Sequence, residues 1–247
     1  SDNHKFRTWR KLWIALAKAE KQLGLDITEQ QIAQLEAHRE DVNYDVAEAR
    51  ERQVRHDVMS HVYAYGQQCP DAEAIIHLGA TSCYVGDNTD VIILRDAARL
   101  VLRKTAQVLR NLAAFADKYK DLPCLGYTHL QPAQLTTVGK RAALWMNELV
   151  MDMENLEYQV SALGLRGVKG TTGTQASFME LFDGDEEKVK ALEKLVAEQV
   201  GFEKWTPVSG QTYSRKVDAY FLGALSGIAQ SACKFATDLR LLQSFEE

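Results

Sequence analysis

Proline and strand patterns are both scarce in this sequence. It has four prolines, at positions 70, 123, 132 and 207. Proline inside a helix removes a hydrogen bond and clashes with the preceding turn, so the long stretches between them are free to form helices. Alternation of apolar and polar residues, which marks strands, is almost absent, whereas apolar residues three or four positions apart are frequent. The sequence therefore predicts an all-α fold.

Cysteines and blocks of like charge are also few. The four cysteines are far apart and form no C-x-x-C pair, so they indicate neither a disulfide framework nor a zinc site. No two histidines are four residues apart, and we expect no metal. The net charge of −5, without a basic block, argues against nucleic-acid binding. We expect no signal peptide from the first residues, and uncharged runs such as residues 219–233 are shorter than the ~20 residues that span a bilayer. We expect a cytoplasmic protein with no membrane partner.

Apolar spacing and end signals predict eight helices, over residues 7–23, 28–38, 45–55, 57–65, 88–119, 132–163, 185–200 and 212–245. Short helices give way to long ones near residue 84. We therefore expect a small N-terminal helical domain over 1–84 and a long-helix bundle domain over 85–247. The last helix is uncharged over 219–233, which predicts burial between subunits. The chain ends on an uncapped helical pattern, so we expect the bundle domain to be truncated at its C-terminal side.

A polar segment around His129 precedes one of the predicted long helices. Thr128 and Gln131 flank the histidine, and Pro132 suits the first position of a helix. The pattern predicts that His129 lies on a tight turn before a helix N-terminus, where partial positive charge favours an anion. Such a histidine is placed to move a proton; the alternative is a surface or capping histidine.

Three further polar segments carry candidate binding groups. Arg55, His56 and Asp57 lie between two predicted helices, where the cation suits a carboxylate or phosphate and Asp57 is a candidate to orient His56. Thr81 and Ser82 follow a glycine turn and offer hydroxyls to an anion. Gln211 stands at the start of the last helix. Each segment has an alternative reading as an ordinary capped turn, and we interpret the neighbouring His77 as structural.

The order of these segments resembles a known family. Arg55-His56-Asp57, then His77 to Ser82, then Thr128 to Gln134, then Gly210 to Tyr213 resemble the adenylosuccinate lyases of the aspartase/fumarase superfamily. A glycine-rich segment over residues 166–175 is similar to the animal-type members in particular. The resemblance covers essentially all 247 residues.

The resemblance implies an L-aspartase/fumarase-like homotetramer, with active sites where three subunits meet. The implied reaction eliminates fumarate from adenylosuccinate to give AMP, and from SAICAR to give AICAR, in purine biosynthesis and without a cofactor. Position by position, it makes His129 the general acid and His56 its helper. It assigns substrate binding to Arg55, Asp57, Thr81, Ser82, Thr128 and Gln211.

Two segments of the family are missing from this sequence. The loop Ser-Ser-x-Met-Pro-x-Lys-x-Asn-Pro, which carries the family's serine base, does not occur, and neither does an N-terminal Arg-Tyr substrate contact. We therefore expect residues 1–247 alone to be inactive. The alternatives are another lyase of the superfamily, such as argininosuccinate lyase, and a non-catalytic helical scaffold subunit.

Overall fold

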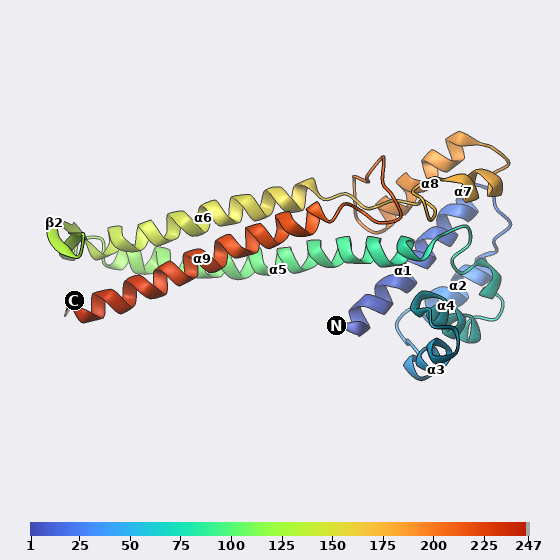
Figure 1. Cartoon of the computed structure of the whole chain (residues 1–247), viewed down its shortest axis with the longest axis horizontal. Coiled ribbons are helices and arrows are strands. Elements are labelled where there is room, and N and C mark those ends of the chain that lie inside the picture. Colours follow the sequence, from blue (N-terminus) through green and yellow to red (C-terminus); the bar gives the residue numbers. More distant parts are fainter. Residues whose placement is uncertain (246–247) are drawn as a thin grey trace. The chain divides into compact units, whose positions relative to one another are not determined.

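The computed structural model describes residues 1–245 (Figure 1). They are mostly helical, and no helix among them is long and apolar enough to cross a membrane. The elements in chain order are α1 (Asp2–Gln22), α2 (Glu29–Ala37), α3 (Tyr44–Val54), α4 (Asp57–Gln68), the 3₁₀ helix η1 (Glu73–Ile75), α5 (Ser82–Lys118), β1 (Pro123–Thr128), β2 (Gln131–Thr137), α6 (Val138–Ala162), α7 (Ala176–Leu181), α8 (Glu186–Gln199) and α9 (Lys216–Ser244).

The described chain forms two compact units. Unit 1 holds Ser1–Ile93 and Leu163–Ser214, and unit 2 holds Leu94–Ala162 and the described residues from Arg215 onward. Residues 163–214 thus return to the unit of the N-terminal helices. The division predicted from the sequence, 1–84 and 85–247, stays a prediction.

The core of unit 1 is built around α1. Its apolar residues recur three and four positions apart, so one stripe of the helix, with Trp9, Leu12, Trp13 and Leu16, is buried. The predicted capping box of α2 is confirmed: the Thr28 hydroxyl accepts from the Gln31 N–H, and Gln31 Oε1 accepts from the Thr28 N–H.

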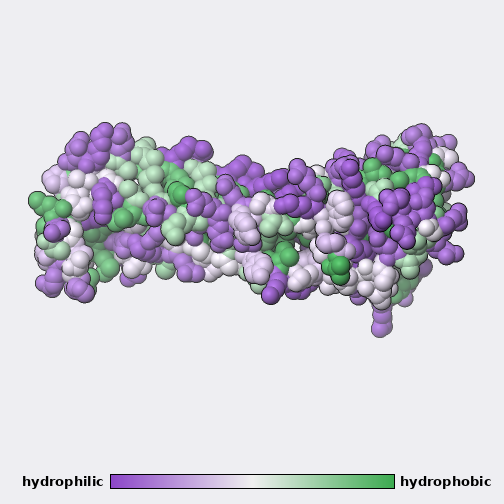
Figure 2. Space-filling view, turned by 90° about the horizontal axis from the view of Figure 1, so that it is seen from above, coloured by the Kyte–Doolittle hydropathy of each residue, from purple (hydrophilic) through white to green (hydrophobic). Residues whose placement is uncertain are grey.

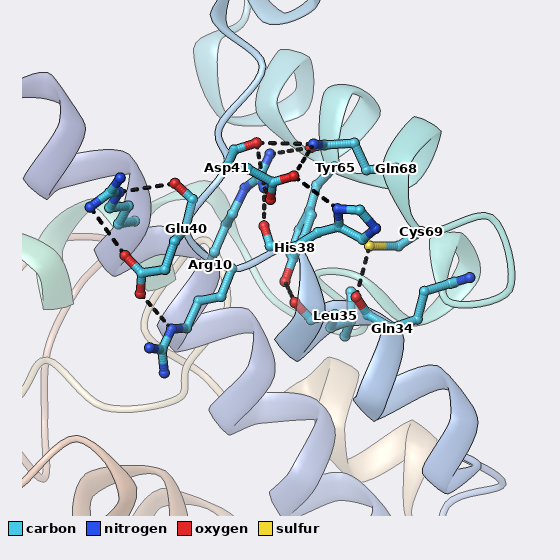
Figure 3. A network of polar contacts seen from close by, with 11 residues as sticks. Arg10, Gln34, Leu35, His38, Glu40, Asp41, Tyr65, Gln68 and Cys69 are labelled. Atoms are coloured by element: carbon cyan, nitrogen blue, oxygen red, sulfur yellow. Dashed lines mark hydrogen bonds and ion pairs between the residues drawn. The ribbon is translucent and has the colours of Figure 1, made fainter.

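A buried arginine ties the short helices of unit 1 together (Figure 3). The Arg10 guanidinium donates to the His38 carbonyl and, at 2.6 Å, to Gln68 Oε1. It also lies 4.2 Å from the centre of the Tyr65 ring, whose hydroxyl donates to the Leu35 carbonyl at 2.6 Å. Burial lowers the pKa of Arg10, but an arginine stays charged at any physiological pH. One cation therefore links α1, the end of α2 and the end of α4.

Unit 2 contains long helices that leave much apolar surface exposed. α6 and α9 pack together, with Trp145 Nε1 donating to Asp238 at 2.8 Å and Ser231 Oγ donating to Asp152 at 2.5 Å. Hydrophobic surface is visible around β1, β2 and the adjacent helix ends (Figure 2). Large exposed apolar side chains occur on all three helices: Leu100, Val108 and Phe115 on α5, Leu144, Val150, Met151 and Tyr158 on α6, and Tyr220, Leu222, Leu225, Leu239 and Leu241 on α9. Large apolar side chains left exposed in such numbers are typical of helices that take part in interactions.

The helix predicted to begin at Pro132 begins instead at Val138, and this prediction was wrong. Residues 123–137 form an antiparallel hairpin in which Thr128 pairs with Gln131 and Tyr127 with Pro132. The two turn residues, His129 and Leu130, have φ of 54° and 59°. Positive φ at both central residues is the geometry of the tight hairpin turns whose twist matches that of strands.

Proline allows both outcomes because its fixed φ suits an extended chain as well as a helix start. Its missing N–H is tolerated in a two-stranded sheet, where each strand has a free edge. The helix start is set by Thr137, whose hydroxyl accepts from the Lys140 N–H at 3.1 Å. Gly139 lets α6 approach the end of α5, since a Cβ there would lie 2.3 Å from the Ala116 carbonyl oxygen.

Candidate active site

His56 lies at the joint between α3 and α4. Arg55 ends α3 with a left-handed φ of 52°, which turns the chain so that His56 becomes the N-cap of α4. The ring Nδ1 accepts from the Met59 N–H at 3.3 Å. This contact leaves the ring proton on Nε2, which lies 3.2 Å from Ser82 Oγ. Two motifs that are 26 residues apart thus meet at one imidazole.

Asp57 is the first residue of α4 and is not its cap. Its Oδ1 accepts from the Val58 N–H at 2.7 Å and lies 3.9 Å from His56 Nδ1. That separation exceeds hydrogen-bond length, and the Nδ1 lone pair is already used. In this geometry the carboxylate of Asp57 does not hold the His56 ring.

Thr81 and Ser82 lie at the start of α5, after a turn with positive φ at His77 (68°) and Gly79 (66°). A Cβ on Gly79 would lie 2.6 Å from Leu181, so the turn packs closely on α7. Thr81 is buried and Ser82 is half-buried. The Ser82 hydroxyl therefore stands beside both His56 and the helix N-terminus, where backbone N–H groups favour an anion.

His77, interpreted from the sequence as structural, accepts at Nδ1 from Trp13 Nε1 at 2.9 Å. Burial, and then the nearby His56, lower the pKa of His77 to about 4, so it is neutral at neutral pH. The effect of His56 on this pKa makes His77 a neighbour of the site as well as a core contact. No sequence signal predicts this, because Trp13 is 64 residues away.

Gln211 also belongs to unit 1 and is exposed. It precedes α9, which begins at Lys216 and not at the predicted residue 212. Its carbonyl accepts from Arg166 Nε at 2.6 Å, and two residues later the Tyr213 N–H donates to Asp87 on α5 at 2.7 Å. The helix that begins with Ser82 therefore also holds the segment of Gln211.

Thr128 and His129 lie in unit 2, at the tip of the hairpin. His129 is exposed beside a groove of about 900 Å³ whose lining includes Lys140, Arg141 and Asp238. Arg141 donates to the Leu125 carbonyl at 2.7 Å and so braces β1. The expected helix N-terminus is replaced by a left-handed turn, a strained backbone that is frequent at functional sites. The cations that accompany His129 come from the first turn of α6.

Comparisons with known proteins place the chain in a family. A family model described as "Lyase" matches residues 2–247. A Saccharomyces cerevisiae protein named adenylosuccinate lyase is 55% identical over 247 residues, covering 99% of this chain and 51% of that protein. A Schistosoma mansoni protein of the same name is 48% identical, covering 100% and 52%.

A solved structure agrees in fold. The crystal structure of a fumarate lyase from Mesorhizobium sp. BNC1 matches with a TM-score of 0.84 at 24% identity, covering 98% of this chain and 56% of that one. The chain spans about half the length of the curated relatives it matches. The family model, however, covers almost every residue. The chain therefore belongs to the lyase family of the aspartase/fumarase superfamily.

Proposed function

We propose that the protein is an adenylosuccinate lyase, which eliminates fumarate from adenylosuccinate to give AMP and from SAICAR to give AICAR. The proposal rests on the 55% and 48% identity to proteins of that name over nearly the whole chain. The observation that carries it structurally is the contact between His56 Nε2 and Ser82 Oγ. This contact brings together two segments of the family motif, and their side chains can bind a carboxylate.

The substrate-binding half of the site lies in unit 1. The C–H bond that breaks is next to a carboxylate, whose charge grows as the proton leaves. Fixed donors around that group lower the barrier. We assign this role to the hydroxyls of Thr81 and Ser82, to the N-terminus of α5 and to the exposed guanidinium of Arg55. Asp57 and Gln211 complete the proposed substrate contacts from unit 1, and we assign a further contact to Thr128 on the hairpin of unit 2.

The acid half lies on the hairpin. The departing nitrogen needs a proton as the C–N bond breaks, and a positioned acid contributes roughly 10²–10⁴-fold. His129 is exposed at a turn, close to a wide groove, so a substrate can reach its ring. His56 serves as its helper, and the serine base comes from the family loop that this sequence lacks. No cofactor enters the scheme.

We further propose a cytoplasmic homotetramer in which three subunits contribute to each site. The apolar side chains exposed on α5, α6 and α9 support this, because burying them between subunits removes their contact with water. Residues 219–233, predicted to be buried in the assembly, are largely exposed in the single chain. Sedimentation of the complete protein as a monomer would contradict the tetramer.

The test measures substrate turnover by the full-length enzyme. Adenylosuccinate and argininosuccinate are offered separately, and conversion of the first to AMP and fumarate is followed by absorbance. We expect His129→Ala to lower kcat by at least about a hundredfold, the size of one general acid's contribution. His4→Ala, which alters an exposed histidine of α1, is the matched control. Turnover of argininosuccinate, or normal turnover by His129→Ala, contradicts the proposal.

A further inference from the structure

Arg166 is a completely buried cation whose role the proposed chemistry leaves open. Its Nη1 donates to the Lys169 carbonyl at 2.8 Å and its Nη2 to the Gly170 carbonyl at 2.7 Å. The same guanidinium reaches a second segment, with Nε 2.6 Å from the Gln211 carbonyl and Nη2 3.3 Å from that of Gly210. Within the described chain, its hydrogen bonds all go to backbone carbonyls.

Burying a charge is costly unless its hydrogen-bonding groups are filled. Here the buried guanidinium of Arg166 joins two segments that are more than 40 residues apart in the chain. Four donated bonds in fixed directions suit the guanidinium fork, whereas a lysine ammonium offers three donors on a flexible stem. The Arg166 guanidinium therefore fixes the backbone at Gln211.

The segment that contains Gln211 has little structure of its own. Residues 206–214 form no helix or strand, and Gln211 itself is exposed. The segment is fixed from the side of α5 by Asp87, which accepts from the Tyr213 N–H at 2.7 Å. Asn88, the next residue, exchanges two hydrogen bonds with Gly167, at 3.1 and 3.2 Å. α5 therefore anchors both segments that Arg166 joins.

The backbone at Gly173 packs closely against the backbone at Ser209 and so gives the segment of Gln211 a further support. Gly173 has φ of 79°, and a Cβ there would lie 1.7 Å from the Ser209 carbonyl oxygen. Only glycine fits between the two chains at this point. The glycine-rich loop over residues 166–174 thus supports the segment over 209–213 along its length.

We propose that Arg166 is a positioning residue for substrate binding: through the carbonyls of Gly210 and Gln211 it holds the Gln211 side chain where the succinyl substrate binds. The inference rests on the proposed function, and it adds a role for the glycine-rich loop in holding the segment of Gln211.

The first test is a double-mutant cycle in the complete enzyme, with adenylosuccinate as the substrate. We expect Arg166→Lys to raise KM by about tenfold with little change in kcat, as for a loss of uniform binding. Gln211→Ala alone should do the same, and the double variant should be little worse than either single variant, because both changes remove one contact. Additive effects on KM, or an unchanged KM in Arg166→Lys, overturn the proposal.

The second test does not depend on activity. Hydrogen exchange of amides in residues 209–213 should become at least about tenfold faster in Arg166→Lys, while exchange in α1 stays unchanged. Unchanged exchange at 209–213 overturns the positioning role, as does an equal increase in α1, which marks general loosening. If the unaltered enzyme does not turn over adenylosuccinate, the proposed function fails, and the exchange comparison still decides whether Arg166 orders this segment.

A second variant moves the same segment without altering a buried charge. Gly173→Ala places a methyl group against the Ser209 carbonyl and should raise KM as Arg166→Lys does. Gly184→Ala is the matched control, because Gly184 has φ of 82° and no neighbouring atom within 4 Å of its Cβ position. Both substitutions strain the backbone alike, so equal KM values for the two variants contradict the proposal.

Discussion

Replacing Glu20 by glutamine should change how the stability of the protein depends on pH. Glu20 lies on α1 and is completely buried, and neither carboxyl oxygen has a hydrogen-bond partner among the described residues. Burial raises the pKa of Glu20 from 4.5 to about 9. The group is therefore protonated in the folded protein and ionised in the unfolded chain across the neutral range.

The sign and size of the effect follow from proton uptake. Between pH 4.5 and about 9, folding takes up one proton at Glu20, so the free energy of unfolding falls as pH rises. The slope is about 1.36 kcal/mol per pH unit, which gives about 2.7 kcal/mol between pH ~5.5 and ~7.5. Glutamine does not titrate. The amide of the glutamine changes the free energy of unfolding by an amount that does not depend on pH. The slope due to residue 20 is therefore absent in Glu20→Gln.

Urea denaturation at several pH values between about 5.5 and 7.5 measures the difference between the wild-type protein and Glu20→Gln. We expect that difference to change by about 2.7 kcal/mol in favour of the variant as pH rises. Glu203→Gln, which alters an exposed carboxylate, is the matched control and should follow the wild-type protein. Parallel curves for the wild-type protein and Glu20→Gln would refute the reasoning.

Three other changes test the site, the helix contact and the division of the chemistry. Arg55→Ala and Ser82→Ala should each weaken binding of adenylosuccinate by about 1.5–3 kcal/mol, the value of a hydrogen bond to a charged group; unchanged KM in both would place the anion elsewhere. Gly139→Ala should lower the melting temperature, because overpacking against the α5 backbone costs about 1–3 kcal/mol, whereas Gly86→Ala, which has open space at its Cβ, should not. Residues 1–247 alone should be inactive, and co-expression with a full-length subunit carrying His129→Ala should restore adenylosuccinate cleavage. Turnover by residues 1–247 alone would put the base within them.

Local signals predicted most helices of this fold. The capping box at Thr28 is the observed start of α2, and the stop predicted at Gly201 lies beside the observed end of α8. The long apolar periodicities correspond to long helices. α5 begins at Ser82, six residues earlier than predicted from its apolar residues, because its first turns bury polar residues such as Asp87 and Asn88. Periodicity of apolar residues does not detect a helix start of that kind.

The hairpin could not be predicted in the same way. Its turn uses His129 and Leu130 in a left-handed conformation, where the usual sequence signal is Asn-Gly or another glycine pair. The contacts of the site are likewise tertiary. His56 meets Ser82, and Arg166 meets Gln211, across distances in sequence that no spacing rule covers. The motif residues were predicted, whereas the residues that hold them in place were not.

The ring stack between Tyr127 and Phe245 has a consequence for synthesis on the ribosome. Tyr127 lies on β1, and Phe245, whose ring centre is 4.7 Å away, follows the last turn of α9. A two-stranded hairpin alone is at best marginally stable in water. The ribosome completes β1 and β2 long before it adds Phe245, so we expect the nascent chain to lack the stacking that steadies the turn of His129. The proposed acid would then be among the last groups of this chain to acquire its geometry, whatever the order in which the long helices form.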